Sequence, residues 1–396
     1  MYKTVIKKCL KWIEEQMLTF DKGRWGVYER IRTDLAERVV LCRPDTASEY
    51  MKVLCLFKEC YRNKRNDRIY ENIRNWLLYA QNNVENEGNA AFPFALIDGN
   101  KKYAGERTLY ENDNAKIIIN LLDLYRYTQD EKLKSAALAC ADFWEEIQTE
   151  EGFFYAEDKA VLQQPYPKAT CFVLWMMAAQ FECYAVTGEK RYLNCGEKAL
   201  HYIYQNIEGN RIRSSYETAH TEEWRPISSE TFIALLCLSR SYRILKRDDI
   251  KDMIFRLLDF AFSLIDEETG AVKNCDESSK YASLQNDEFL CDLVYTQGFA
   301  LNAMIELYTV FQKKDYYLKA KKLADWLGSV QLNEKNPLID GGWRGSYNLK
   351  LKKYYGKCTN ALEEGGCSSV YTGWCALPIV MGLLKIESRK FDSDNF

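Results

Sequence analysis

The chain has 396 residues, of which 47% are hydrophobic and 28% charged, a composition typical of globular proteins. Its formal net charge of −3 predicts no basic face, so the sequence does not indicate a nucleic-acid partner. The 14 cysteines include no Cys-x-x-Cys pair, and a chain of this length needs no disulfide staples, so we expect buried free thiols.

The sequence predicts a cytoplasmic protein without a membrane partner. Residues 1–8 begin an amphipathic segment and lack the uninterrupted apolar run of a secretory signal. The least charged stretch, residues 368–384, is about 17 residues long, which is marginal for a membrane span. A buried helix explains this stretch better.

Polar turns recur along the chain at a spacing of roughly 60 residues, which predicts stacked helical hairpins, because one hairpin cannot bury its apolar face alone. The turns are residues 65–70, 128–133, 187–192, 246–250 and 313–318. Apolar residues at helical spacing on one stripe also predict six helices with a solvent-facing side. These first helices are predicted over residues 4–18, 67–83, 131–148, 189–205, 249–265 and 316–330.

Six further segments are apolar nearly all round, which predicts helices that are buried on every side. They are residues 45–61, 112–127, 169–186, 227–245, 292–311 and 369–386. Pro44, Pro167 and Pro226 lie just before or at the starts of these second helices, where the missing N–H has no cost. Pro378 falls inside the sixth and is predicted to kink or end it.

The alternation of exposed and buried helices predicts an all-α fold, an (α/α)6 toroid of six helical hairpins in two concentric rings. We expect residues 1–396 to form one domain. An open superhelix of TPR or HEAT repeats is the alternative, but those repeats run about 34 to 47 residues. The connection from each first helix to its second helix is long and the return turn is short. Six long loops are therefore expected on one rim, and we expect the functional site there.

The return turns follow the pattern Tyr/Phe-x-x-Thr-Gly-Asp/Glu-x-x-Tyr/Leu-Leu, which resembles the six-hairpin glycosidase superfamily over about the whole chain. The resemblance implies carbohydrate processing, by glycoside hydrolases, sugar epimerases or polysaccharide lyases. In its size and in its lack of a secretory signal, the chain resembles the unsaturated glucuronyl and galacturonyl hydrolases and the N-acylglucosamine 2-epimerases. The epimerases depend on paired histidines. This chain has only His201, in a first helix, and His220, in a rim loop, which disfavours an epimerase.

Glycoside cleavage requires one protonated and one ionised carboxyl group. Asp113, at the start of the second buried helix, resembles the position of a catalytic aspartate in the unsaturated glucuronyl hydrolases. Those enzymes carry another aspartate at the third buried helix, where this chain reads Pro167-Lys168-Ala169-Thr170. The partner of Asp113 is therefore expected among Glu223, Glu230 and Asp45. For all of these acids a role at a helix N-terminus is the alternative.

Arginine binds carboxylates through a two-point fork and aromatic rings suit sugar planes, so rim residues of these types are candidates for substrate binding. With the polar residues beside them, the candidates are Arg43, Asn112, His220, Trp224, Arg225, Trp343, Arg344 and Tyr371. Ion pairing with rim acids and structural packing are the alternatives.

The sequence thus predicts a glycoside hydrolase for a small oligosaccharide, uronic acids included, with no cofactor and no metal. The acidic run at residues 248–252 lies in a return turn on the opposite rim, which disfavours a metal site. Two other hypotheses are a polysaccharide lyase or uronyl epimerase, and a glycan-binding toroid without chemistry. The first would depend on rim tyrosines, namely Tyr28, Tyr216, Tyr295 and Tyr371. The oligomeric state stays open.

Overall fold

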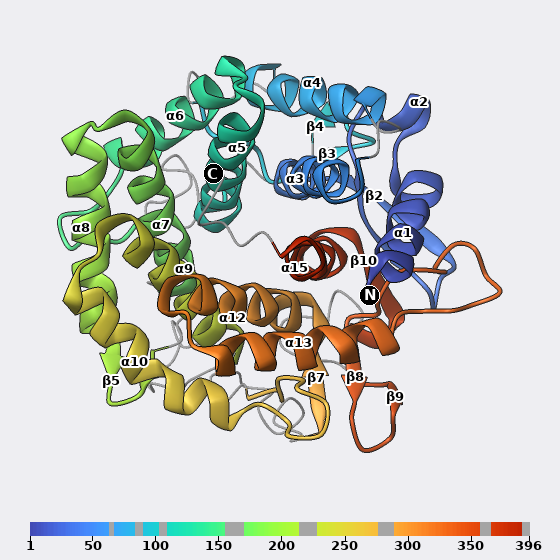
Figure 1. Ribbon diagram of the computed structural model, residues 1–396. Helices are drawn as coiled ribbons and strands as arrows, with labels where there is room; N and C mark the ends of the chain where they lie inside the picture. Colours follow the sequence, from blue (N-terminus) through green and yellow to red (C-terminus); the bar gives the residue numbers. More distant parts are fainter. Residues whose placement is uncertain are drawn as a thin grey trace.

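The computed structural model describes residues 1–62, 67–83, 90–102, 109–154, 170–213, 228–275, 289–356 and 366–389. In these ranges the helices form two concentric rings around one axis (Figure 1). The predicted all-α toroid is therefore confirmed.

The outer ring consists of amphipathic helices that bury one face against the inner ring. In α4 the buried residues include Ile69, Ile73 and Trp76, which belong to the stripe that the sequence predicts. The outer helices are α1 (Lys3–Trp12), α4 (Asp67–Asn83), α6 (Glu131–Glu146), α8 (Lys190–Gln205), α10 (Asp248–Ser263) and α13 (Lys314–Ser329). The π-helical turn η1 (Ile13–Met17) extends α1, and the single turn α2 (Phe20–Gly23) follows it.

The inner ring consists of helices that are buried nearly all round. In α5 every residue from Glu111 to Leu124 is buried. The inner helices are α3 (Pro44–Tyr61), α5 (Glu111–Thr128), α7 (Thr170–Thr187), α9 (Ser228–Leu245), α12 (Gly298–Phe311) and α15 (Leu377–Ser388). Each packs against the next, and contacts between α15 and α3 close the ring.

The last two inner helices begin later than the sequence predicts. Strand β7 (Leu290–Asp292) and the π-helical turn η3 (Leu293–Gln297) precede α12, while β10 (Ser369–Tyr371) and the irregular turn η5 (Thr372–Ala376) precede α15. The expectation that Pro378 kinks or ends its helix is wrong. It lies in the first turn of α15, where its missing N–H is tolerated. The backbone instead departs from helical geometry at Trp374, which has φ 58°.

Short antiparallel strands lie in several of the described connections between outer and inner helices. The largest sheet has the order β10-β1-β2-β3-β4, in which Arg30 pairs with Tyr371. It places Arg43 directly after β2 and Trp374 shortly after β10. Its other strands are β1 (Tyr28–Arg32), β2 (Glu37–Cys42), β3 (Leu96–Ile97) and β4 (Lys101–Lys102). The remaining elements are β5 (Ile207–Glu208), β6 (Arg211–Ile212), β8 (Ser346–Asn348), β9 (Lys353–Tyr354) and the 3-10 turn η4 (Gly366–Ser368).

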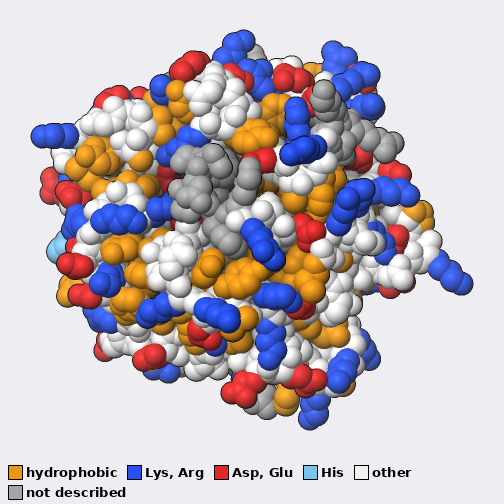
Figure 2. Space-filling model, viewed as in Figure 1, with side chains coloured by type: hydrophobic (Ala, Val, Ile, Leu, Met, Phe, Trp, Pro, Cys, Tyr) orange, Lys and Arg blue, Asp and Glu red, His pale blue; other side chains and the backbone are white. Residues whose placement is uncertain are grey.

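The cysteines agree with the expectation of free, mostly buried thiols. Side chains of both charges are interspersed over the face shown in Figure 2. The cysteines whose side chains the structure describes are free thiols, and most of these are buried. Among the helices that the structure describes, none has the length and apolar character required to cross a membrane.

Candidate functional site

The first turns of α3 and α5 bring Asp45 and Asp113 to the same buried cluster, because these two inner helices pack side by side. Arg43 precedes α3 in an extended conformation, and Pro44 begins the helix. An acid in the first turn of a helix is favoured by the helix dipole, and both aspartates occupy such a position. Pro44 provides the fixed backbone angle suited to a helix start.

Arg43 is the hub of this cluster. Its Nε and Nη2 atoms donate to the two oxygens of Asp45, each at 3.1 Å. The same Nη2 donates to Asp113 Oδ2 at 2.7 Å, while Nη1 donates to Glu29 Oε1 at 3.1 Å. The guanidinium carbon also lies 4.6 Å from the ring centroid of Phe94. One buried cation therefore holds three carboxylates from β1, α3 and α5 together.

Lys116 and Trp374 complete the cluster from α5 and η5. The Nζ atom of Lys116 lies 2.8 Å from Glu49 Oε1 and 3.4 Å from Asp45 Oδ2. It also lies 3.4 Å from the ring centroid of Trp374. The indole Nε1 of Trp374 donates to Asp45 Oδ2 at 2.6 Å. Trp374 thus joins the last inner helix region to the first.

The two aspartates have opposite protonation tendencies. Burial raises the pKa of Asp113 to about 7, although the nearby cations Arg43 and Lys116 oppose this. Burial also disfavours the charge of Asp45, but Arg43 and Lys116 outweigh it and hold the pKa of Asp45 below its ordinary value. Two carboxyl groups whose pKa values diverge in this way are the arrangement that acid–base catalysis uses.

Asp45 is also the most fully hydrogen-bonded carboxylate of the cluster. Five donors reach its oxygens: two atoms of Arg43, the backbone N–H of Thr46, Lys116 Nζ and Trp374 Nε1. Hydrogen bonds to the charged form of a carboxylate stabilise that form. Few acceptor positions remain for a substrate, so Asp45 is suited to hold negative charge beside Asp113.

A second pair of acids, Glu111 and Glu230, lies near Tyr202 of the outer helix α8. Glu111 is buried in the first turn of α5, and its Oε1 has no hydrogen-bond partner among the described residues. Burial raises the pKa of Glu111 well above its ordinary value. The pKa of Tyr202 on α8 is raised by burial and by the charges of Glu111 and Glu230. Glu230, in the first turn of α9, is thus near Tyr202, and it is not among the charges that act most strongly on Asp113.

Two of the residues predicted to bind substrate lie close to the cluster in the chain. Asn112 precedes Asp113 and is buried, with an Oδ1 that has no hydrogen-bond partner within the described ranges. Tyr371 ends β10 just before η5 and is 2% exposed, with the guanidinium carbon of Arg30 5.8 Å from its ring centroid.

Trp343 and Arg344 have structural contacts instead. Trp343 is completely buried, and its Nε1 donates to the carbonyl oxygen of Leu327 at 2.9 Å. This burial disfavours a role of its ring as a sugar platform, which stays a prediction. Arg344 Nη1 donates to Thr33 Oγ1 at 2.7 Å and to the carbonyl of Cys367 at 2.9 Å, which ties two rim segments together.

Four predicted site residues lie outside the described residues, namely His220, Glu223, Trp224 and Arg225. His201 lies on the outer helix α8, as expected. Its side chain is exposed, and its Nε2 is 2.8 Å from Gln205 Nε2.

Three members of the cluster were not predicted: Glu29, Lys116 and Trp374. The only local signal for Lys116 in the sequence is its spacing, because this cation stands three residues after Asp113 and therefore on the same helix face. Glu29 and Trp374 reach the cluster through strand pairing, which no local pattern indicates.

No protein-family model and no curated protein matches the sequence. Solved structures of the same fold do match it. A GH76 α-mannanase from Bacteroides thetaiotaomicron is 13% identical with a TM-score of 0.71, covering 98% of this chain and 96% of that chain. A cellobiose 2-epimerase from Spirochaeta thermophila is 14% identical with a TM-score of 0.72, covering 98% and 95%.

An unsaturated glucuronyl hydrolase variant, in a structure with dGlcA-Glc-Rha-Glc, is 12% identical with a TM-score of 0.66, covering 98% and 97%. These matches establish the fold. The (α/α)6 toroid expected from the six-hairpin glycosidase resemblance is confirmed over nearly the whole chain.

Proposed function

We propose that the protein is an enzyme, a glycoside hydrolase that acts on a small oligosaccharide containing an acidic sugar. The observation that carries the proposal is the pair of aspartates on one guanidinium, Asp113 with a pKa of about 7 and Asp45 held ionised. Support for a carbohydrate substrate comes from the shared fold, since the similar structures include a mannanase and a glucuronyl hydrolase.

In this proposal Asp113 is the general acid. Its carboxyl proton passes to the glycosidic oxygen as the C–O bond breaks, and the leaving sugar departs as an alcohol. Water then adds to the anomeric carbon, and the proton that water releases returns to the enzyme, so that one water is consumed.

Asp45 acts as a positioning residue. Its fixed negative charge disfavours ionisation of Asp113, and Arg43 holds the two side chains together. Because donors surround Asp45, the base that activates water is sought elsewhere. Glu223 and Glu230 stay the candidates for that base.

The histidine content favours hydrolysis over an epimerisation that uses two catalytic histidines. The chain has 2 histidines. His201 lies on the outer helix α8 with an exposed side chain, so His220 is the one histidine that remains as a candidate for catalysis at the rim. A paired-histidine mechanism therefore lacks its second member.

A panel of small oligosaccharides, unsaturated uronyl disaccharides included, tests the proposal. The purified protein is incubated with each sugar and the products are analysed by mass spectrometry in H₂¹⁸O. Hydrolysis predicts cleavage with incorporation of one labelled water. Cleavage without water and with a new ultraviolet absorbance would identify a lyase instead. An isomer of unchanged mass would identify an epimerase, and binding without any turnover would identify a glycan-binding toroid.

A further inference from the structure

Trp374 contacts three charged residues at the Arg43 cluster, each with a different part of the residue. Its indole N–H donates to Asp45 Oδ2 at 2.6 Å, and its backbone N–H donates to Glu49 Oε2 at 3.3 Å. The Nζ atom of Lys116 lies 3.4 Å from the ring centroid, and a cation is attracted to the face of an indole. The turn before the last inner helix thus reaches the charges of α3 and α5 through one residue.

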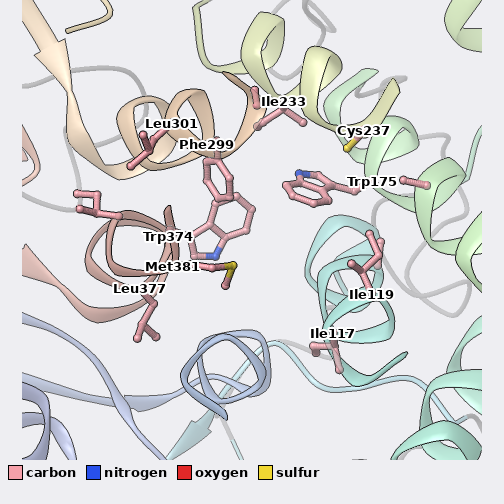
Figure 3. Close-up of a cluster of buried hydrophobic side chains, with 14 of the residues drawn as sticks. Ile117, Ile119, Trp175, Ile233, Cys237, Phe299, Leu301, Trp374, Leu377 and Met381 are labelled. Atoms are coloured by element: carbon pink, nitrogen blue, oxygen red, sulfur yellow. The ribbon is translucent and has the colours of Figure 1, made fainter. Parts of the chain in front are cut away.

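The position of this indole is fixed by its surroundings. Its ring centroid lies 5.5 Å from that of Phe299 and 5.6 Å from that of Tyr295, and both pairs are edge-to-face. Figure 3 shows Phe299 directly beside Trp374 among the buried side chains of the inner ring. The backbone of Trp374 has φ 58°, a left-handed angle that costs free energy in a residue with a side chain and that is found mostly where function requires it. Packing and backbone together direct the indole N–H toward Asp45.

The charged groups around Asp45 come from β1, α5 and the first turns of α3 with the residue before it. They are Glu29, Arg43, Glu49, Asp113 and Lys116. Arg43 divides its N–H groups between the acids, and its Nη2 serves Asp45 and Asp113 at once. A further donor at Asp45 therefore changes how much of Arg43 is available to Asp113. Trp374 is such a donor and carries no charge of its own.

We propose that Trp374 is a positioning residue of the site, whose indole N–H holds the Asp45 carboxylate and so leaves Arg43 shared with Asp113. Without this donor, the charge of Asp45 is less compensated and draws the guanidinium toward itself. Arg43 then donates less to Asp113, so the ionised form of Asp113 is disfavoured. The catalytic meaning of this role rests on the proposed function, in which Asp113 is the general acid, whereas the role itself can be measured without a substrate.

NMR of the full-length protein with ¹³C at the aspartate carboxyl groups tests this role. One signal of the wild type should titrate at about pH 7, and its absence in Asp113→Asn assigns it. Trp374→Phe keeps an aromatic ring beside Lys116 and removes the N–H. It should raise the midpoint of the Asp113 titration by about 0.5–1 pH unit, a part of what a hydrogen bond to a charged group contributes.

Trp12→Phe is the matched control. Trp12 is also buried, and its Nε1 donates at 2.8 Å to a backbone carbonyl, that of Leu338, instead of to an acid of the cluster. The midpoint should not change in this variant. An equal rise in both variants would assign Trp374 a structural role only and overturn the proposal.

The other outcomes separate Trp374 from the general acid. An Asp113 that titrates with the same midpoint in wild type and Trp374→Phe would overturn the role of Trp374 alone, whereas a wild type in which no aspartate titrates at about pH 7 would overturn both. If no sugar is hydrolysed, the glycosidase assignment fails, but a raised midpoint in Trp374→Phe still supports the positioning role.

If Trp374→Phe does not fold, the indole N–H signals of the wild type replace it. Ionisation of Asp113 draws Arg43 toward itself and leaves Asp45 a stronger acceptor for Trp374. One of the nine indole signals should therefore move downfield as Asp113 titrates and stay in place in Asp113→Asn. The absence of such a signal would overturn the proposal.

Discussion

Arg43 Nη2 lies 2.7 Å from Asp113 Oδ2 and joins the residue before α3 to the first turn of α5. The same nitrogen lies 3.1 Å from Asp45 Oδ2, so the two aspartate oxygens are no farther apart than the sum of these distances. Arg43 favours the ionised form of both acids, but burial and the charge of Asp45 keep the pKa of Asp113 raised, whereas Asp45 also accepts from Lys116, Trp374 and the Thr46 N–H and stays ionised. The predictions below follow from this arrangement.

The activity is expected to fall as the pH rises through about 7. Burial is the largest cause that raises the pKa of Asp113 to about 7, and a general acid works only while it is protonated. The value of kcat/KM should therefore be high below this pKa and decrease about tenfold per pH unit above it. Initial rates between pH 5 and 9 at constant ionic strength check this. An activity that rises through neutral pH would assign Asp113 the role of a base.

Arg43→Gln should destabilise the fold by roughly 3–5 kcal/mol at pH 7, because it leaves buried carboxylates without their cation. Burial raises the pKa of Asp45, and Arg43 is the strongest of the groups that lower it, so the variant loses stability that ionised Asp45 contributes above its unfolded pKa. The loss of stability should therefore grow as the pH rises from 4 to 7 and be smallest in acid. Urea unfolding at several pH values measures it.

Arg191→Gln is the control for this measurement. Arg191 is 40% exposed in its ion pairs with Asp142 and Glu189, and such pairs contribute about 0–1 kcal/mol. If the Arg43→Gln variant were as stable as this control, the claim that buried Arg43 stabilises the fold would be contradicted.

Gly373→Ala should lower both stability and activity. A Cβ at Gly373 would lie 2.1 Å from Thr46 Oγ1, so η5 must move away from α3. That movement displaces Trp374 from Asp45. Overpacking of this kind lowers the free energy of unfolding by about 1–3 kcal/mol. Gly328→Ala on α13, where the nearest atom is 3.6 Å away, is the control that should leave both unchanged or slightly stabilise the helix.

Trp343→Phe should destabilise the protein by about 1–3 kcal/mol, because the carbonyl of Leu327 loses its donor. KM should stay the same, since the ring is completely buried. Thermal unfolding and saturation kinetics on one preparation separate the two effects. A raised KM at unchanged stability would restore Trp343 as a sugar platform.

The helix pattern of the sequence predicts the fold well because each ring has its own signature. Outer helices such as α4 alternate apolar and polar faces, and inner helices such as α7 are apolar all round. Most predicted bounds agree with the structure within two residues at each end. The exceptions lie directly after α1 and directly before α12 and α15. There π-helical turns and strands replace regular helix, and the apolar pattern of the sequence does not distinguish them from a helix.

The site could be predicted only in part. Asp45, Asp113 and Arg43 are recognisable as rim residues, but their contact joins positions 70 residues apart and follows from the packing of α3 on α5. Lys116 stands three residues after Asp113, but a helix that is buried all round does not indicate which of its sides faces the axis, so the spacing alone does not predict its contact with Asp45. Glu29 and Trp374 depend on strand register between β1, β2 and β10, which is set by long-range pairing.

The most direct test of the account is the activity of Asp113→Asn on the substrate that the oligosaccharide panel identifies. Asn keeps the size of the side chain and removes the proton donor, so kcat/KM should fall by about 10²–10⁴-fold while the melting temperature changes little. An aryl glycoside of the same sugar, whose leaving group needs no proton, should lose much less activity. Asp142→Asn, on the outer helix α6, should behave as wild type. Full activity of a folded Asp113→Asn variant would contradict the account.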